Sequence, residues 1–155
     1  MHESVLFVDQ DNNCLSAIAE FAFRKAICFR VPATSAGLAV VDPFLHMHAR
    51  ELLRDEGFDF EMFLSFRAKP AHERLIASHD LVFAFNAQDL RALRERFPAH
   101  ADEMHLLNDF AGESGELFDP CGKEGKDGDK SVSQDGFSKA YAELFSLSKK
   151  AAQRL

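Results

Sequence analysis

The 155-residue sequence contains no tryptophan, one tyrosine and only three cysteines, Cys14, Cys28 and Cys121. An odd and sparse set of cysteines argues against a disulfide framework and is more typical of free thiols in a reducing cytoplasm. No CxxC pair is present, which argues against a structural zinc site. The aromatic content comes instead from sixteen phenylalanines, which predict an apolar core rich in aromatic rings.

The sequence also lacks a basic run, and its formal net charge is −7. Nucleic acids and anionic membranes both require clustered lysine and arginine, so neither is an expected partner. No apolar stretch approaches the roughly 20 residues that cross a bilayer. The opening residues, MHESVLFVDQDN, have no basic region of the kind that begins a signal peptide. We therefore expect a cytoplasmic protein with a single domain over residues 1–155.

Short apolar runs alternate with helical patterns along the chain. The apolar runs predict strands at 4–8, 29–35, 81–85 and 104–107, and Pro32 predicts an edge position for the second of them. The helical patterns predict a first helix that Ser16 caps and that ends at about Ala26, and further helices at 42–56, 87–97 and 137–154. For the second helix, Asp42 is the expected cap, Pro43 the first residue and Gly57 the stop. Residues 111–136 are rich in Gly, Asp, Ser and Lys and predict a long loop.

This alternation indicates βαβ units and therefore an α/β fold with a parallel sheet. Ligands of such sheets bind at the carboxyl ends of the strands, near the point where the strand order reverses. The polar segment from Asp9 to Leu15 follows the first strand, so it is the candidate site.

The segment VLFVDQDNNCLSAIAE resembles the opening of the low-molecular-weight tyrosine phosphatases and the related arsenate reductases. In that family a strand leads into Cys-x-Gly-Asn-x-Cys-Arg-Ser-Pro, and a helix begins at an Ile-Ala-Glu-like sequence. The positions that match are Asn12, Cys14, Ser16, Ile18, Ala19 and Glu20. Further matches follow in the family's order over essentially the whole chain: Ser35-Ala36-Gly37, Asp42-Pro43, LVFAFNAQDLRAL and Asp119-Pro120.

The resemblance implies a three-layer sandwich, in which a four-stranded parallel sheet of order 2-1-3-4 carries helices on both faces. It implies no cofactor. Asp119 stands at the general-acid position, and Cys121 replaces the aromatic residue that commonly follows Asp-Pro. The phosphate-binding loop would consist of Asp11, Asn12, Asn13, Cys14, Leu15 and Ser16.

The departures from the family pattern fall on the residues that carry the chemistry. Asp9 stands in place of the cysteine that attacks phosphorus, Leu15 in place of the arginine, and Asp11 in place of the first glycine. Two of these changes add negative charge, and the third removes the guanidinium fork that would neutralise a phosphate. Two unit charges about 4 Å apart interact by about 4 kcal/mol at an effective dielectric of 20. The resemblance therefore indicates an inactive pseudophosphatase that acts as a binding or regulatory module. Its expected partner is a protein or peptide, bound where the family has its active-site cleft.

Asp9 is expected to occupy the vacated anion site, because a carboxylate accepts hydrogen bonds well at a helix N-terminus. Cys14 is expected to be a small buried residue at the helix start. Without a thiol at position 9, a redox pair within the loop is not expected.

Three alternatives remain open on the sequence. Asp9, Asp11 and Asp119 could hold a cation and support a metal-assisted hydrolase. The chain could also retain weak phosphatase activity. Finally, FVDQD resembles the opening of haloacid-dehalogenase-like phosphatases, although Asn13 stands where that family has Thr or Val. His46 and His48 are two residues apart, so they are not expected to share a helix face or to bind a metal as a pair.

Overall fold

The structure is a computed structural model that describes residues 4–117 and 134–155. Its four strands form one parallel sheet in the order β2-β1-β3-β4, which confirms the predicted order. The strands are β1 (Val5–Asp9), β2 (Ala33–Gly37), β3 (Leu81–Ala84) and β4 (Met104–Leu106). β1 pairs with β2 along its whole length, so that Asp9 lies opposite Gly37 at the carboxyl end of the sheet.

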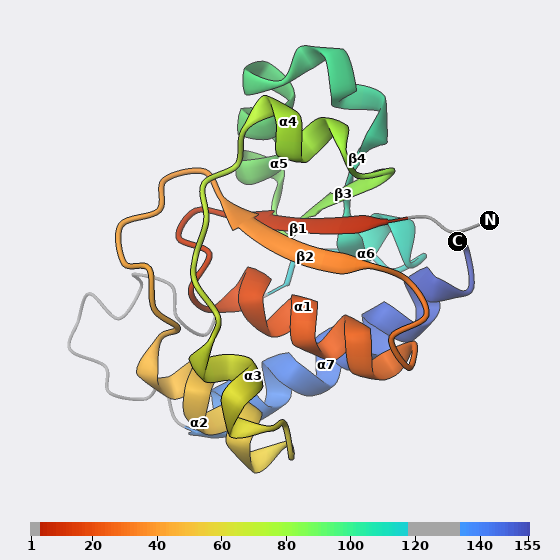
Figure 1. Cartoon of the computed structure of the whole chain (residues 1–155). Helices are drawn as coiled ribbons and strands as arrows, with labels where there is room; N and C mark the ends of the chain where they lie inside the picture. Colours follow the sequence, from red (N-terminus) through yellow and green to blue (C-terminus); the bar gives the residue numbers. More distant parts are fainter. Residues whose placement is uncertain (1–3, 118–133) are drawn as a thin grey trace, which may run out of the picture.

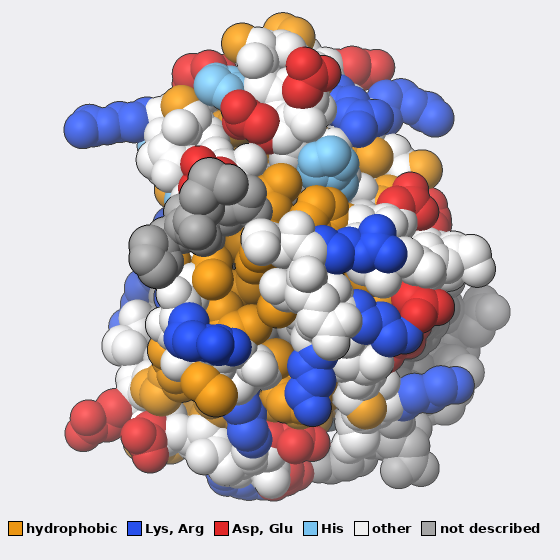
Figure 2. Space-filling model, turned by 90° about the vertical axis from the view of Figure 1, so that its right-hand side faces the viewer, with side chains coloured by type: hydrophobic (Ala, Val, Ile, Leu, Met, Phe, Trp, Pro, Cys, Tyr) orange, Lys and Arg blue, Asp and Glu red, His pale blue; other side chains and the backbone are white. Residues whose placement is uncertain are grey.

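Helices cover both faces of the sheet, as the three-layer prediction requires (Figure 1). One face carries α1 (Leu15–Ala26) and α7 (Gln134–Ala152), with α2 (Met47–Asp55) and α3 (Phe60–Leu64) beyond them. The other face carries α4 (Glu73–Ala77) and α5 (Ala87–Arg96). The short helix α6 (Leu107–Phe110) and a 3₁₀ turn at Pro98–Glu103 flank β4. Within the described residues, no helix combines the length and apolarity needed to span a membrane. The face shown in Figure 2 carries both basic and acidic side chains around apolar ones.

Strand β1 is buried on both faces because it lies in the middle of the sheet between two helical layers. Side chains alternate along a strand. Val5 and Phe7 therefore pack in the core shared with α1 and α7, while Leu6 and Val8 pack in the core beneath α4 and α5. The ring of Phe7 contacts three other phenylalanine rings at centroid distances of 5.5 to 6.1 Å. The predicted phenylalanine-rich core is thus confirmed.

The predicted second strand is displaced along the chain. It was expected at 29–35 but runs over Ala33–Gly37, because the chain turns first: Cys28 and Phe29 both have positive φ, and the Phe29 side chain is exposed. Its edge position is confirmed, and the carbonyl of Pro32 accepts a hydrogen bond from the Val5 N–H.

The predicted start of the second helix is wrong. Asp42 does not cap a helix; its carboxylate accepts the Phe44 N–H at 2.9 Å in a local turn, and α2 begins only at Met47. Helices α3 and α4 were not predicted, because five residues are too few for a clear helical period. The first helix begins at Leu15, and Cys14 is its N-cap residue, so the prediction that Ser16 caps it is wrong. Of the predicted loop at 111–136, residues 118–133 lie outside the described part of the chain, and α7 begins at Gln134.

Candidate functional site

The candidate site is the loop that joins β1 to α1 at the carboxyl end of the sheet (Figure 1). Asp9 is the last residue of β1 and continues its alternation, so its side chain faces the same side as Val5 and Phe7. That is the side on which α1 packs. The strand therefore directs the Asp9 carboxylate toward the N-terminus of α1.

The Asp9 carboxylate is buried, with 8% of the residue exposed, and accepts hydrogen bonds through both oxygens. Oδ1 accepts the Asn12 N–H and the Ser16 hydroxyl, each at 2.8 Å. Oδ2 accepts the Ser16 N–H at 2.9 Å. This geometry confirms the expectation that Asp9 points into the loop and accepts backbone N–H groups at the start of the first helix.

Asp9 thereby caps a helix that lacks a cap of its own. Cys14 is the N-cap residue of α1 and makes no side-chain capping hydrogen bond, and the first turn carries no acidic residue. Four N–H groups at a helix start have no partner within the helix, and that end attracts negative charge. Asp9 supplies both the acceptor and the charge from seven residues upstream.

Asn12 holds the loop in place from its centre. It is fully buried and has a φ of +52°, a left-handed conformation that Asn tolerates better than most residues. Its side-chain N–H₂ donates to the Ser16 hydroxyl at 2.9 Å, and its side-chain oxygen accepts the Lys69 N–H at 2.9 Å. Asn12 therefore ties the loop to a segment 57 residues further along the chain.

Leu15 occupies the arginine position of the resemblance and is buried at 2% exposure within the core shared with α1 and α7. Its side chain brings no hydrogen-bond donor to the loop. Cys14 is also buried, as expected, but it is disulfide-bonded. The expectation that all the cysteines are free thiols is therefore wrong at Cys14, while Cys28 is free and exposed.

Asp11 and Asn13 lie on the outer side of the loop and are partly exposed. The carbonyl of Asn13 accepts the His46 N–H at 2.8 Å, which joins the loop to the start of α2. Asp119, the predicted general acid and third metal candidate, lies outside the described residues. Within residues 4–117 and 134–155, no three His, Cys, Asp or Glu side chains are grouped so as to hold a metal ion.

Gly37 lets β2 pass close to the loop. A Cβ atom built there would lie 2.9 Å from the Gln10 carbonyl oxygen and 3.0 Å from the Asn12 Cβ. Such contacts are too short for a side chain, so the loop conformation depends on glycine at this position.

Two groups of contacts around the loop were not predicted from the sequence. Gln10 donates to the Asp89 carboxylate at 2.7 Å. Asp89 also accepts a hydrogen bond from the side-chain N–H₂ of Asn86, whose side-chain oxygen caps α5 by accepting the Asp89 N–H. An Asn cap followed by an acid three residues later is a sequence signal that could have identified this pair. Lys69 also donates from Nζ to Thr34, and burial lowers the pKa of its ammonium group despite the nearby Glu20. No local pattern marks Lys69.

His46 and His48 lie closer together than their spacing suggested. His46 precedes α2 rather than lying within it, and its ring is 5.4 Å from the ring of His48. His46 Nδ1 accepts the His48 N–H at 3.2 Å and so caps α2. Burial lowers the pKa of His46, and the neighbouring His48 lowers it further, while Asp42 raises it.

Comparison with known proteins places the chain in a phosphatase family. The family model for low molecular weight phosphotyrosine protein phosphatase matches residues 4–155. The low molecular weight protein tyrosine phosphatase from T. tengcongensis is 30% identical, with a TM-score of 0.84 over 99% of both chains. A mutant of the YwlE arginine phosphatase, in which serine replaces cysteine and is phosphorylated in the active site, is 26% identical, with a TM-score of 0.83 over 98% of this chain and 95% of that one.

The tyrosine phosphatase Wzb from Escherichia coli K30, in complex with sulphate, shares the fold at 21% identity, with a TM-score of 0.80 over 99% of both chains. A comparison with curated proteins found no match.

Proposed function

Because the chain belongs to the low molecular weight phosphotyrosine protein phosphatase family, we propose that it is a pseudophosphatase: a binding or regulatory module that has lost phosphatase turnover. The observation that carries the proposal is the position of Asp9. Its carboxylate fills the loop in which the family would hold a phosphate, and it accepts the N–H groups of Asn12 and Ser16.

The missing nucleophile supports the proposal. A thiolate attacks phosphorus as a strong nucleophile. The Asp9 carboxylate is a weaker one, and three hydrogen bonds within the loop hold both of its oxygens. These donors stabilise the ionised carboxylate and reduce its availability for attack.

The missing arginine gives a second and independent reason. A guanidinium fork neutralises the phosphate and the charge that develops during transfer. Leu15 is apolar and buried in the core, so it cannot take that role. An incoming phosphate dianion would meet Asp9 and Asp11 without a compensating cation from this position.

A carboxylate-based or metal-assisted hydrolase has less support. The oxygens of Asp9 are engaged by donors, and the Asp11 side chain makes no hydrogen bond or ion pair with another described group. We propose instead that the surface beside the loop, where the family has its active-site cleft, binds a protein or peptide partner, since the fold is retained while the groups for phosphoryl transfer are replaced.

The proposal predicts no turnover of p-nitrophenyl phosphate or of a phosphotyrosine peptide, and no tight binding of vanadate by the wild-type chain. Calorimetric titration with vanadate should show weak binding to Asp9→Ala and stronger binding to Asp9→Ala with Leu15→Arg. Asp109→Ala, on the exposed surface of α6, removes the same charge and is the matched control. We expect it to behave as the wild type.

Asp9→Cys with Leu15→Arg tests whether the remaining site can still support chemistry. We expect slow turnover of p-nitrophenyl phosphate, limited by the opposing charge of Asp11. Turnover by the wild-type chain, or a vanadate affinity equal to that of the double variants, would contradict the proposal.

A further inference from the structure

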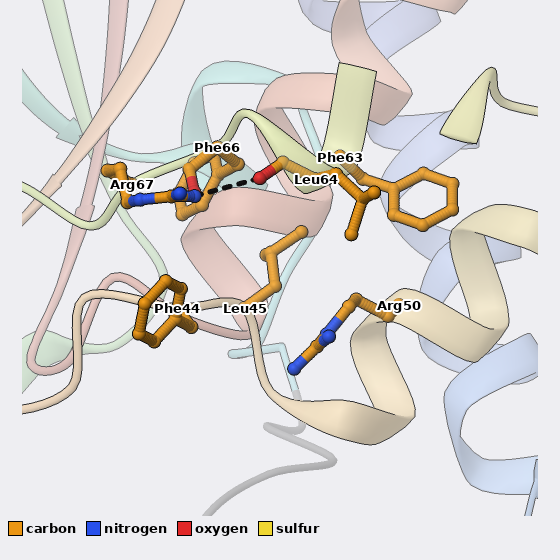
Figure 3. Close-up of a pocket in the computed structure, with 7 residues that line it drawn as sticks. All are labelled: Phe44, Leu45, Arg50, Phe63, Leu64, Phe66 and Arg67. Atoms are coloured by element: carbon orange, nitrogen blue, oxygen red, sulfur yellow. Dashed lines mark hydrogen bonds between the residues drawn. The ribbon is translucent and has the colours of Figure 1, made fainter. Parts of the chain in front are cut away.

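A second concave surface lies between α2, with the segment that leads into it, and α3, with the segment that follows it (Figure 3). It encloses about 320 Å³. We call it the 44–67 groove; it is lined by Phe44, Leu45, Arg50, Phe63, Leu64, Phe66 and Arg67. None of these residues belongs to the loop that Asp9 fills.

The lining of the groove is mostly apolar and leaves large side chains in water. Phe63 and Phe66 are buried, whereas Phe44 is 50% exposed and Leu64 is 39% exposed. Phe60, which is 64% exposed, packs edge-on against Phe63 with 5.5 Å between ring centroids, so it extends the apolar surface. Large apolar side chains that stay exposed beside a concave surface favour a binding role for that surface.

Two arginines give the groove a positive charge. The Arg67 guanidinium lies over the Phe44 ring at 4.7 Å and donates to the carbonyls of Leu64 and Phe66, which hold it in place (Figure 3). Arg50 comes from α2 and is exposed. In the part of the chain that the structure describes, no carboxylate forms an ion pair with either arginine. The chain as a whole carries 25 acidic and 18 basic side chains, so the lack of such ion pairs does not follow from a shortage of acidic residues.

We propose that the 44–67 groove binds a short acidic segment of a partner protein, with one large apolar side chain of that segment inserted between Phe44 and Leu64. Aromatic residues and arginine are the types enriched at protein interfaces and at their energetic centres. The apolar lining would receive the inserted side chain, and Arg50 and Arg67 would pair with carboxylates on either side of it. This inference does not depend on whether the chain has phosphatase activity.

The size and charge of the groove favour a peptide over other occupants. Its volume is at the lower end of the roughly 300–1,000 Å³ typical of small-molecule sites, which suits one or two side chains. The net charge of −7 opposes approach to an anionic membrane, where the whole chain would be repelled. A short acidic segment brings only a few charges to the two arginines.

The first test uses three labelled heptapeptides and fluorescence anisotropy with the full chain. The probe is Glu-Asp-Glu-Phe-Leu-Asp-Glu; one control replaces Phe and Leu by Ala, and the other replaces every acid by Lys. We expect saturable binding of the probe and at least about 10-fold weaker binding of both controls. The absence of saturable binding up to about 1 mM would contradict the proposal, and so would equal binding of all three peptides.

The second test uses variants of Arg50, whose side chain makes no hydrogen bond or ion pair with another described group, so that its loss should not unfold the chain. Arg50→Ala should weaken binding of the probe about 5- to 10-fold. Arg91→Ala, an exposed position on α5 across the sheet, is the charge-matched control and should leave binding unchanged. Arg50→Glu should reverse the preference toward the lysine peptide, which a non-specific charge effect would not do.

The third test measures binding of the chain to vesicles that contain anionic lipid. We expect no binding of the wild-type chain to them. Binding that Leu64→Asp abolishes would assign the groove to a membrane surface and would overturn the proposal.

Discussion

The loop between β1 and α1 and the 44–67 groove differ in how their charged side chains are partnered. In the loop, a buried carboxylate meets hydrogen-bond donors from its own chain: Asp9 accepts from Asn12 and Ser16. In the groove, Arg50 and Arg67 form no ion pair with any carboxylate among the described residues. The two regions are also linked, because the His46 N–H, next to the groove residue Leu45, donates to the Asn13 carbonyl of the loop.

The contrast shows how a single carboxylate can change the use of a site. A helix N-terminus attracts an anion. Once Asp9 provides that anion from within the chain, the loop becomes a structural unit with buried and partnered polar groups. In the groove, no described carboxylate pairs with Arg50 or Arg67, so both can pair with carboxylates of another molecule. We therefore expect substitutions in the loop to act mainly on stability and substitutions in the groove to act mainly on binding.

The largest effect is expected for Asp9→Ala. The substitution leaves the buried N–H groups of Asn12 and Ser16 without their acceptor, and each such loss costs about 1–3 kcal/mol. We expect the free energy of unfolding to fall by about 2–4 kcal/mol in urea titrations, since water entering the loop offsets part of the sum. Asp11→Ala, which removes the same charge without removing a hydrogen bond to a described group, should stay within about 0.5 kcal/mol. Equal losses for the two variants would show that bulk charge, and not capping by Asp9, sets the stability of the loop.

Gly37→Ala should have the next largest effect. The added Cβ would lie 2.9 Å from the Gln10 carbonyl oxygen, which is backbone and cannot turn aside. Overpacking of this kind costs about 1–3 kcal/mol, measured as a lower midpoint of urea unfolding. Gly136→Ala in α7 is the matched control, because nothing lies within 4 Å of its added Cβ, and it should stabilise the chain by about 0.5–1 kcal/mol. If Gly37→Ala leaves the midpoint unchanged, the loop and β2 are not as closely packed as described.

Phe44→Ala should cost less, about 0.5–1 kcal/mol, because the half-exposed ring mainly loses its contact with the Arg67 guanidinium. The Phe44→Ala variant should nevertheless bind the acidic peptide about 10-fold more weakly than the wild type. Phe29→Ala, at a residue that is 60% exposed and does not line the groove, should leave peptide binding unchanged. A large loss of stability with unchanged binding at Phe44 would reverse the comparison between groove and loop.

The smallest effect concerns the pH dependence of stability at His46, between the two regions. Its pKa is lowered in the folded chain, so the unfolded chain binds more protons between that pKa and about 6.5. The contribution of His46 is therefore fully present above pH 6.5 and is lost as the pH falls through this window. Protonation would also remove the Nδ1 acceptor that caps α2.

His46→Asn tests this dependence, because asparagine keeps a capping acceptor but does not titrate. Urea titrations from pH 8 to pH 5.5 should show similar stability for both chains at pH 8 and a smaller loss on acidification for the variant. An identical slope for the two chains would assign the acid sensitivity to other groups, of which His105 also has a pKa lowered by burial.

The family motif predicted the architecture well. The residues VLFV predicted the central buried strand, and the matches in order along the chain predicted the sheet order. Asp9 could be placed in the loop because a strand directs successive side chains to opposite faces and a helix start follows directly. The starts of β2 and α2 were predicted less well, since Phe29 and Asp42 lie in turns that resemble a strand and a helix cap only when read locally.

The sequence by itself determined the chemistry available at the loop: a carboxylate in place of a thiol, and an apolar side chain in place of a guanidinium. It also determined the apolar periodicity from which the layers follow. The tertiary structure alone decided how these parts meet. The hydrogen bond from Lys69 to Asn12 spans 57 positions, and the close approach of Gly37 to Gln10 joins β2 to the loop. Residues so far apart in the chain share no local pattern, and only the packing of β1 against β2 and α1 brings them together.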